Sequence, residues 1–263
     1  MQNQEPIIKI QNLVTYYGPR KVLDGVNLDI MPGETMTILG RSGCGKSTLL
    51  RHLIGLSKSS SGNISVKGHD ITTLSEEEML PIRRKIGMLF QGAALFNSMN
   101  VGDNVALPLR EHTELEESTI KIMTRMKLDQ VGLSGFEEFM PAQLSGGMKK
   151  RAALARAIAM DPDILFCDEP SAGLDPIVAV GIDQLILKLK KAFHMTIVVV
   201  THELESVFLI SDRVALLDNG KIIALGTVEE LKQSANEKVQ QFFNRIPDPE
   251  KIDRESYLNS LVG

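Results

Sequence analysis

A nine-residue segment, Gly40–Thr48, sets the strongest constraint on how this chain can fold. It reads GRSGCGKST and fits the pattern G-x-x-x-x-G-K-[ST] at every fixed position. The apolar run Thr35–Leu39 before it predicts a buried strand, and Leu49–Leu56 after it predicts the continuation of a helix that begins near Lys46. A glycine-rich loop between a strand and a helix is the setting in which this pattern binds phosphate. The segment therefore predicts an α/β fold built around a phosphate-binding loop.

The residue types of this loop suit a phosphate ligand. Glycines at positions 40, 43 and 45 let backbone N–H groups turn inward, and the start of a helix adds a positive end. Lys46 is predicted to reach the β- and γ-phosphates of a nucleotide, with Ser47 on Mg²⁺. A chance glycine-rich turn is the alternative, but it would not need the flanking strand and helix. The predicted nucleotide-binding residues of the loop are Gly40, Arg41, Ser42, Gly43, Cys44, Gly45, Lys46, Ser47 and Thr48.

Composition limits the class of protein. The 263 residues, 43% of them hydrophobic, can form one large α/β domain or two lobes. A net charge of −4 with both signs interspersed gives no support for a nucleic-acid partner. The N-terminus lacks the features of a signal peptide and no apolar run reaches the ~18 residues of a membrane span, so we expect neither export nor membrane insertion. Cys44 and Cys167 form no disulfide or zinc pattern, which suits a reducing cytoplasm.

The first 35 residues predict an antiparallel layer ahead of the main sheet. Ile7–Leu13 and Val22–Ile30 alternate between apolar and polar residues, and Tyr16–Pro19 between them is predicted to form a turn. Tyr17 stands just before the glycine of that turn and upstream of the phosphate-binding loop. It is therefore a candidate platform on which adenine stacks, with a half-buried strand tyrosine as the alternative.

The chain changes character at Gln91. This residue follows the apolar strand Ile86–Phe90, at a place where a strand delivers side chains to a site, so it is a ligand candidate. Residues 92–160 then show helical periodicity without strand alternation, which predicts a helical insertion.

The segment Leu144–Met148, reading LSGGM, opens the third helix of that insertion. Ser145, Gly146 and Gly147 predict a second anion-binding helix end, similar to the phosphate-binding loop but without a lysine. The alternative is an ordinary helix cap.

Two adjacent carboxylates follow the apolar strand Ile164–Cys167. The C-terminal edge of such strands is where an open α/β sheet places its chemistry. Asp168 is predicted to hold Mg²⁺ through water, and Glu169 to polarise an attacking water. An acidic pair placed there by chance is the alternative. Asp175, in the following turn SAGLD, is predicted to cap the next helix ahead of Pro176.

His202 ends a second buried strand, Thr196–Val200, which we expect to neighbour the acidic strand. It is predicted to contact the γ-phosphate, although a lone histidine can also be structural. The chain then returns as a hairpin, Arg213–Leu217 and Lys221–Leu225, around the two-residue turn signal Asn219-Gly220.

Together and in this order, the motifs resemble those of the nucleotide-binding subunits of ABC transporters over residues 7–226. The resemblance implies a P-loop NTPase (RecA-like) core, ATP and Mg²⁺ as cofactors, and ATP hydrolysis coupled to transport. The implied motifs are the Walker A loop at 40–47, the Q-loop at Gln91, the signature at 144–148, the Walker B strand at 164–169, the D-loop at 171–175 and the H-loop at His202. Many relatives have glutamine at the position of Met148, which puts one contact near the ribose in doubt.

In that family two subunits pair head to tail, so that the signature of one covers the γ-phosphate on the Walker A loop of the other. The resemblance therefore implies a second copy of this chain as a partner. The implied catalytic residues are Glu169 as base, His202 and Gln91; the implied metal ligands are Ser47, Gln91 and Asp168; the implied nucleotide contacts outside the loop are Tyr17, Ser145, Gly146, Gly147 and Asp175.

The same resemblance divides the chain. Residues 7–91 and 161–226 are expected to form the ATP-binding core with its antiparallel layer, and residues 92–160 a helical subdomain that carries the signature. Residues 227–263 are expected to form a C-terminal helical extension. In it a last helix is predicted near Asp253 and is expected to dock on a neighbouring chain, with a frayed end as the alternative.

Two longer sequence segments, residues 90–115 and 144–162, resemble those of the ATPase subunit of Mla-type phospholipid transport systems. Such systems imply an inner-membrane permease, an MCE-domain lipid-binding protein and a STAS-domain protein as partners, at the cytoplasmic face of the inner membrane. Leu95, Phe96 and Met99 are the predicted permease contact, with internal packing as the alternative. The alternative functions are the ATPase of an amino-acid or methionine importer and a soluble ABC protein acting on ribosomes or DNA. A non-hydrolysing nucleotide sensor is disfavoured by the retained Glu169.

Overall fold

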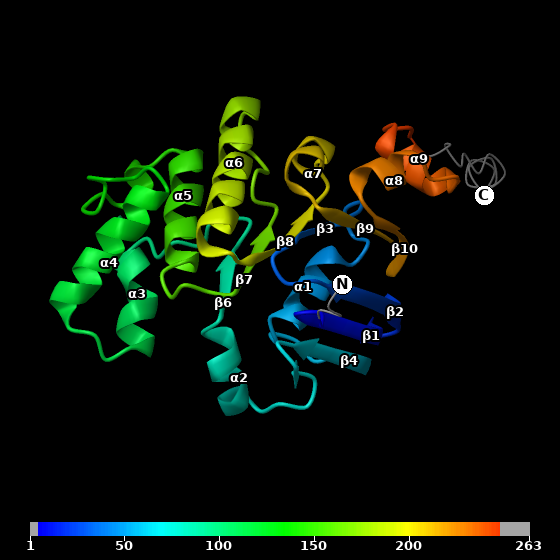
Figure 1. Cartoon of the computed structure of the whole chain (residues 1–263), viewed down its shortest axis with the longest axis horizontal. Helices are drawn as coiled ribbons and strands as arrows, with labels where there is room; N and C mark the ends of the chain where they lie inside the picture. Colours follow the sequence, from blue (N-terminus) through cyan, green and yellow to red (C-terminus); the bar gives the residue numbers. More distant parts are fainter. Residues whose placement is uncertain (1–4, 248–263) are drawn as a thin grey trace, which may run out of the picture.

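The central element of the structure is a six-stranded, mostly parallel sheet. The computed structural model describes residues 5–247 (Figure 1). In spatial order the strands are β10 (Lys221–Gly226), β9 (Arg213–Asp218), β3 (Thr35–Leu39), β8 (Thr196–Thr201), β7 (Ile164–Asp168) and β6 (Ile86–Leu89). Strand β10 is antiparallel to β9, and the other neighbours run parallel. The carboxyl ends of β6, β7, β8 and β3 therefore meet at one edge, and the predicted pairing of the acidic strand with the histidine strand is confirmed.

A second, antiparallel sheet forms the N-terminal layer. Its order is β2 (Arg20–Ile30), β1 (Ile8–Tyr17), β4 (Ser61–Val66) and β5 (His69–Asp70). The predicted hairpin is confirmed, but the predicted turn was too wide. Pairing continues to Tyr17 opposite Arg20, so both tyrosines are strand residues and only Gly18 and Pro19 turn.

Helix α1 (Lys46–Leu53) joins the two sheets. Its buried Leu49, Leu50 and Leu53 share one apolar cluster with side chains of both sheets. On β7, Ile164 and Phe166 belong to this cluster, whereas their neighbours in sequence belong to the cluster on the opposite face. Side chains of a strand alternate between its faces, so β7 is apolar from Ile164 to Cys167 because it is covered on both sides.

The opposite face of the sheet is covered by helices. Residues 92–160, all of them described, contain helices and no strand, as their periodicity predicts. Figure 1 shows α3, α4 and α5 gathered at one end of the molecule, beside α6. The bounds are α3 (Val101–His112), α4 (Glu117–Gln130), η1 (Pro141–Gln143), α5 (Gly146–Ala157) and α6 (Pro176–Phe193).

Shorter helices complete the described chain. Helix α2 (Glu76–Arg83) begins with the predicted serine cap, in which Ser75 and Glu78 bond each other's backbone N–H. Helices α7 (Leu204–Ile210), α8 (Val228–Lys232) and α9 (Glu237–Phe243) share a third apolar cluster. Helix α7 was not predicted, because seven residues between two strands carry too little periodicity to stand out.

The rest of the predicted C-terminal extension, including the helix near Asp253, lies outside the described residues. Across residues 5–247, none of the helices combines the length and the apolar character that crossing a membrane requires.

Candidate nucleotide-binding and hydrolytic site

The phosphate-binding loop follows β3 and runs directly into α1. Gly45, at the helix N-cap, has φ 112°, a left-handed value that a residue with a side chain adopts only with strain. Gly40 is required for a different reason, because a Cβ there would lie 2.4 Å from the carbonyl oxygen of Leu217 and 2.7 Å from Sγ of Cys44. Backbone and helix start are thus arranged as the pattern predicts.

Lys46 is buried under the loop that it belongs to. Its Nζ donates hydrogen bonds to the carbonyl oxygens of Gly40 at 2.9 Å and Arg41 at 3.0 Å. A buried ammonium is tolerated only where hydrogen bonds replace water. These two bonds keep a positive charge on the floor of the loop, where phosphate oxygens would arrive.

Glu169 and His202 meet at the carboxyl edge of the sheet. One carboxylate oxygen of Glu169 lies 2.8 Å from Nδ1 of His202, and the other accepts a hydrogen bond from Oγ1 of Thr201 at 3.0 Å. Glu169 is 8% exposed, and the His202 side chain is half exposed. Neighbouring parallel strands therefore bring two residues 33 positions apart into direct contact, as their predicted places at strand ends require.

The backbone at Glu169 is strained. Its φ is 47°, in the left-handed region that residues with side chains rarely adopt. Its N–H donates to the carbonyl of Val200 at 2.8 Å, which fixes this conformation. Strained residues of this kind cluster at functional sites.

Asp168 has the properties of a metal ligand. One carboxylate oxygen is buried and has no hydrogen-bond partner within residues 5–247. Burial, and then the charge of Glu169, raises the pKa of Asp168. A bound cation would give this oxygen a partner and would favour the ionised carboxylate, so the site fits Mg²⁺. The described residues contain no group of three His, Cys, Asp or Glu side chains that could bind a metal. Mg²⁺ suits such a site, because it is commonly held by one or two carboxylates together with substrate phosphates.

A cavity of about 490 Å³ brings most of the predicted site together. Arg20, which the sequence analysis did not single out, lies on the wall beside Tyr17, because it faces that tyrosine across the β1–β2 pair. Tyr17 is half exposed and available as a flat surface. The predicted residues that line the cavity are Tyr17, Ser42, Gly43, Gly45, Lys46, Ser47, Thr48, Gln91, Glu169 and His202.

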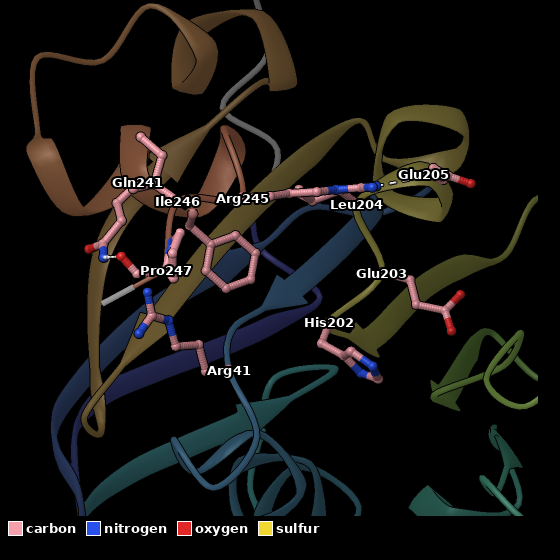
Figure 2. Close-up of a pocket in the computed structure, with 10 residues that line it drawn as sticks. Arg41, His202, Glu203, Leu204, Glu205, Gln241, Arg245, Ile246 and Pro247 are labelled. Atoms are coloured by element: carbon pink, nitrogen blue, oxygen red, sulfur yellow. Dashed lines mark hydrogen bonds and ion pairs between the residues drawn. The ribbon is translucent and has the colours of Figure 1, made fainter. Parts of the chain in front are cut away.

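Two side chains of the loop point elsewhere. Cys44 is buried, and burial raises the pKa of its thiol, so it packs beneath the loop. Arg41 lines a neighbouring cavity of about 550 Å³ next to α9. Figure 2 shows its side chain on the side of Gln241 and Pro247, with His202 on the other side of that cavity. Arg41 therefore contributes its backbone to the loop, while its side chain faces the C-terminal helices.

Outside the phosphate-binding loop, four predicted nucleotide contacts do not line the cavity. Ser145 caps α5 by accepting a hydrogen bond from the N–H of Met148, and Asp175 caps α6 in the same way through Val178. Ser145 and Gly146 are exposed at the start of α5. Gly147 is buried against α6, so closely that a Cβ on it would lie 2.5 Å from the Val178 side chain. In a single chain these residues are helix starts that lie outside the lining of this cavity.

Lys150 is a site residue that the sequence analysis missed. It lies on α5, is 5% exposed, and donates hydrogen bonds to the carbonyl oxygens of Gln91 and Glu169. Its only signal in the sequence is a position six residues after Leu144 in a run of basic residues, which is equally typical of an exposed helix face.

Comparison with known proteins decides the family. The sequence profile of the ABC transporter family matches residues 23–172. The chain belongs to the ABC transporter family. This ABC chain is 45% identical to the intermembrane phospholipid transport system ATP-binding protein MlaF of Haemophilus influenzae, over 92% of both chains. It is 40% identical to MlaF of Escherichia coli K12, over 94% of this chain and 92% of that one.

Among other relatives of the chain, one is named for a different transport role and another has a solved structure. The probable ribonucleotide transport ATP-binding protein mkl of Mycobacterium leprae is 42% identical over 90% of this chain and 68% of its own. The dimeric ATP-binding cassette MJ0796, in a post-hydrolysis state with ADP and Pi, matches with a TM-score of 0.77 and 32% identity over 84% of this chain and 98% of that one. The expected P-loop NTPase fold is confirmed by this likeness.

Proposed function

We propose that this chain is the ATP-hydrolysing subunit of a Mla-type phospholipid transporter. The main support for ATP hydrolysis is that one cavity is lined both by Lys46 of the phosphate-binding loop and by the Glu169–His202 pair. The solved cassette MJ0796, similar over most of this chain, was captured with ADP and Pi, the two products of that reaction.

The side chains of the cavity divide the work of ATP binding and hydrolysis. Tyr17 offers a face for adenine, and Lys46 with the loop N–H groups binds the phosphates. Ser47, Gln91 and Asp168 would hold Mg²⁺, which when bound neutralises phosphate charge.

Glu169 accepts the proton of the attacking water. Because an ionised carboxylate only accepts hydrogen bonds, Nδ1–H of His202 and the Thr201 hydroxyl both donate to it and hold its oxygens in place.

Replacing Glu169 by glutamine tests the assignment. Glu169→Gln keeps the size of the side chain but removes the proton acceptor, so steady-state ATP hydrolysis should fall by about 10² to 10⁴ while ATP binding is kept. Phosphate release and nucleotide binding would be measured on the same preparation. Hydrolysis within a factor of two of the unmodified protein would refute the role of Glu169.

The proposal that the transported cargo is a phospholipid rests on the similarity to the MlaF proteins. The two MlaF proteins share 45% and 40% identity over at least nine-tenths of both chains, whereas mkl extends well beyond the matched region. We therefore infer an Mla-type assembly, with an inner-membrane permease, an MCE-domain protein and a STAS-domain protein as partners. The chain would sit at the cytoplasmic face of the membrane, held there by the permease. Purification of the tagged chain, with identification of bound proteins and lipids, tests this inference.

A groove of about 590 Å³ between β6 and α3 is the proposed permease contact. Its floor is apolar, and Phe96 on its wall is half exposed. Arg83, Arg84 and Arg156 line it against a single acidic residue, Glu111, so an apolar segment with acidic flanks would fit. Of the other two predicted contacts, Leu95 packs against the helical core and Met99 is half buried, so Phe96 carries the proposal.

Phe96→Asp tests the groove. A buried carboxylate would oppose docking of an apolar segment, and we expect permease retention in pull-downs to fall at least ~10-fold. Ile122→Asp is the matched control, because Ile122 is 61% exposed on α4, outside the groove. Equal retention by both folded variants would remove the groove from the proposal.

The proposed division of the chain follows from the same arrangement. We propose residues 92–160 as a helical subdomain and residues 7–91 and 161–226 as the ATP-binding core. Movement between the two parts would act at the loop after Gln91, where they join.

A further inference from the structure

Helix α5 connects three parts of the site through one buried side chain. Nζ of Lys150 lies 2.6 Å from the carbonyl oxygen of Gln91 and 3.0 Å from that of Glu169. Gln91 follows β6, Glu169 follows β7, and Ser145 caps the first turn of α5 itself. Lys150 does not line the nucleotide cavity, so it can act on that cavity only through these residues.

The environment of Lys150 is costly for a charge. Burial lowers the pKa of its ammonium group, and the negative charges of Asp168, Glu169 and Glu203 act in the opposite direction. Both of its hydrogen bonds within the described residues go to backbone carbonyls, and neither goes to a carboxylate. A buried ammonium is retained where its hydrogen bonds are made, and here they are made to the backbone of two predicted catalytic residues.

The backbone that Lys150 holds is strained. Glu169 has φ 47°, and its N–H and C=O are both bonded, to Val200 and to Lys150. In the loop after Gln91, Ala93 and Ala94 have φ 62° and 52°.

Helix α5 holds this second strained turn as well. The carbonyls of Ala93 and Ala94 accept hydrogen bonds from the guanidinium of Arg156, which is also on α5. Helix α5 thus holds both ends of the loop from Gln91 to Ala94 and the turn at Glu169.

We propose that Lys150 is a positioning residue for ATP hydrolysis, which ties Gln91 and Glu169 to the helix that carries the signature. The proposal rests on the proposed ATPase function. While α5 lies against β6 and β7, the carbonyl bonds keep both side chains at the cavity. Helix α5 would shift when Ser145 meets the nucleotide bound to a partner chain, or when the permease docks in the groove at Phe96. Glu169 would then move away from its position at the cavity.

The test compares Lys150→Met, Lys150→Arg and, as a matched loss of a charged lysine, Lys121→Met on the exposed face of α4. Methionine fills the same space without donors, and arginine keeps donors and charge. We expect kcat for ATP hydrolysis to fall at least ~10-fold in Lys150→Met, because small displacements of reacting groups cost that much or more. KM for ATP should change less than ~3-fold, and Lys150→Arg should recover most of kcat.

Three results would overturn the proposal. They are a kcat in Lys150→Met within twofold of Lys121→Met, a loss of activity that appears in KM alone, and equal inactivity of folded Lys150→Met and Lys150→Arg. Should Lys150→Met fail to fold, Lys150→Leu, which also lacks donors, replaces it under the same criteria. Folding is checked by thermal unfolding of the full chain.

Glu169→Gln, assayed in parallel, distinguishes failure of the proposed hydrolytic site from failure of the positioning role of Lys150. Turnover that survives Glu169→Gln means the proposed hydrolytic site is wrong. Turnover lost in Glu169→Gln but kept in Lys150→Met means that the site stands and only the positioning role fails.

Discussion

At the scale of single residues, the site holds its buried charges mainly with neutral partners. Lys46 and Lys150 each donate to two backbone carbonyls, and Glu169 accepts from the hydroxyl of Thr201 and the ring of His202. No side-chain ion pair joins a lysine to a carboxylate among these described residues. The carboxylates of Asp168 and Glu169 therefore stay available for a cation and for a proton.

Asp183 is a buried charge with a different consequence. It lies on α6 and is 2% exposed, and one of its oxygens has no hydrogen-bond partner within residues 5–247. Burial raises its pKa to about 6, a hydrogen bond from Ser206 opposes this shift, and the charge of Glu203 adds to it. The folded state therefore holds the proton more tightly than the unfolded state, whose pKa is near the model-peptide value.

Asp183→Asn should consequently change the pH dependence of stability. A raised carboxyl pKa means that the folded state loses stability as pH rises from the unfolded pKa to about 6, because ionisation favours the unfolded chain. Asparagine removes this loss. Between pH 5 and pH 7.5 the free energy of unfolding of the variant should gain about 1 kcal/mol on that of the unmodified protein. Urea denaturation at both pH values measures the difference, and an identical difference at both would contradict the raised pKa.

At the scale of elements, glycines set how closely α5 approaches its neighbours. A Cβ on Gly87 of β6 would lie 2.5 Å from the carbonyl of Ala157, and a Cβ on Gly147 would lie 2.5 Å from the Val178 side chain of α6. Such distances are well below van der Waals contact. This close packing brings Lys150 within reach of the carbonyls after β6 and β7.

Gly147→Ala should therefore destabilise the fold by about 1 to 3 kcal/mol, the usual cost of overpacking. Gly181→Ala is the matched control, because its Cβ would meet Arg151 at 3.6 Å, an ordinary contact, in the middle of α6. There alanine should be neutral or stabilising, since glycine is the poorer helix former. Equal stability of the two variants in urea denaturation would mean that α5 and α6 can separate without cost.

At the scale of the whole molecule, the chain contains two halves of a site that do not face each other. Lys46 and Glu169 line the cavity, whereas Ser145 and Gly146 are exposed at the start of α5, outside it. Because the similar cassette MJ0796 was solved as a dimer, we propose that a second copy brings its α5 to this cavity. Each site would then need one residue set from each chain.

A mixed dimer tests this sharing. Pairing a Lys46→Ala chain with a Ser145→Arg chain gives one site with both defects and one with neither, so part of the ATPase activity should return. Pairing a Lys46→Ala/Ser145→Arg chain with an unmodified chain gives the same mutations but no intact site. With two affinity tags selecting mixed dimers, equal activity of the two pairings would contradict shared sites.

The sequence by itself determined the local parts of the protein. The strand, loop and helix around Lys46 are contiguous, so their pattern predicted both the fold class and the phosphate site. Glu169 and His202 were predictable because both follow apolar strands, and parallel strands deliver their carboxyl ends to one edge. Helical periodicity likewise predicted α3, α4 and α5.

Only the tertiary structure decided contacts between distant segments. Lys150 bonds residues 59 and 19 positions away, and it reads in the sequence as one more exposed lysine. The direction of Arg41 toward α9 was equally hidden, and only the structure decided for Leu95 between permease contact and internal packing. The physical reason is that a local pattern fixes which face of an element is apolar, whereas the partner of a polar side chain depends on how closely the folded elements approach.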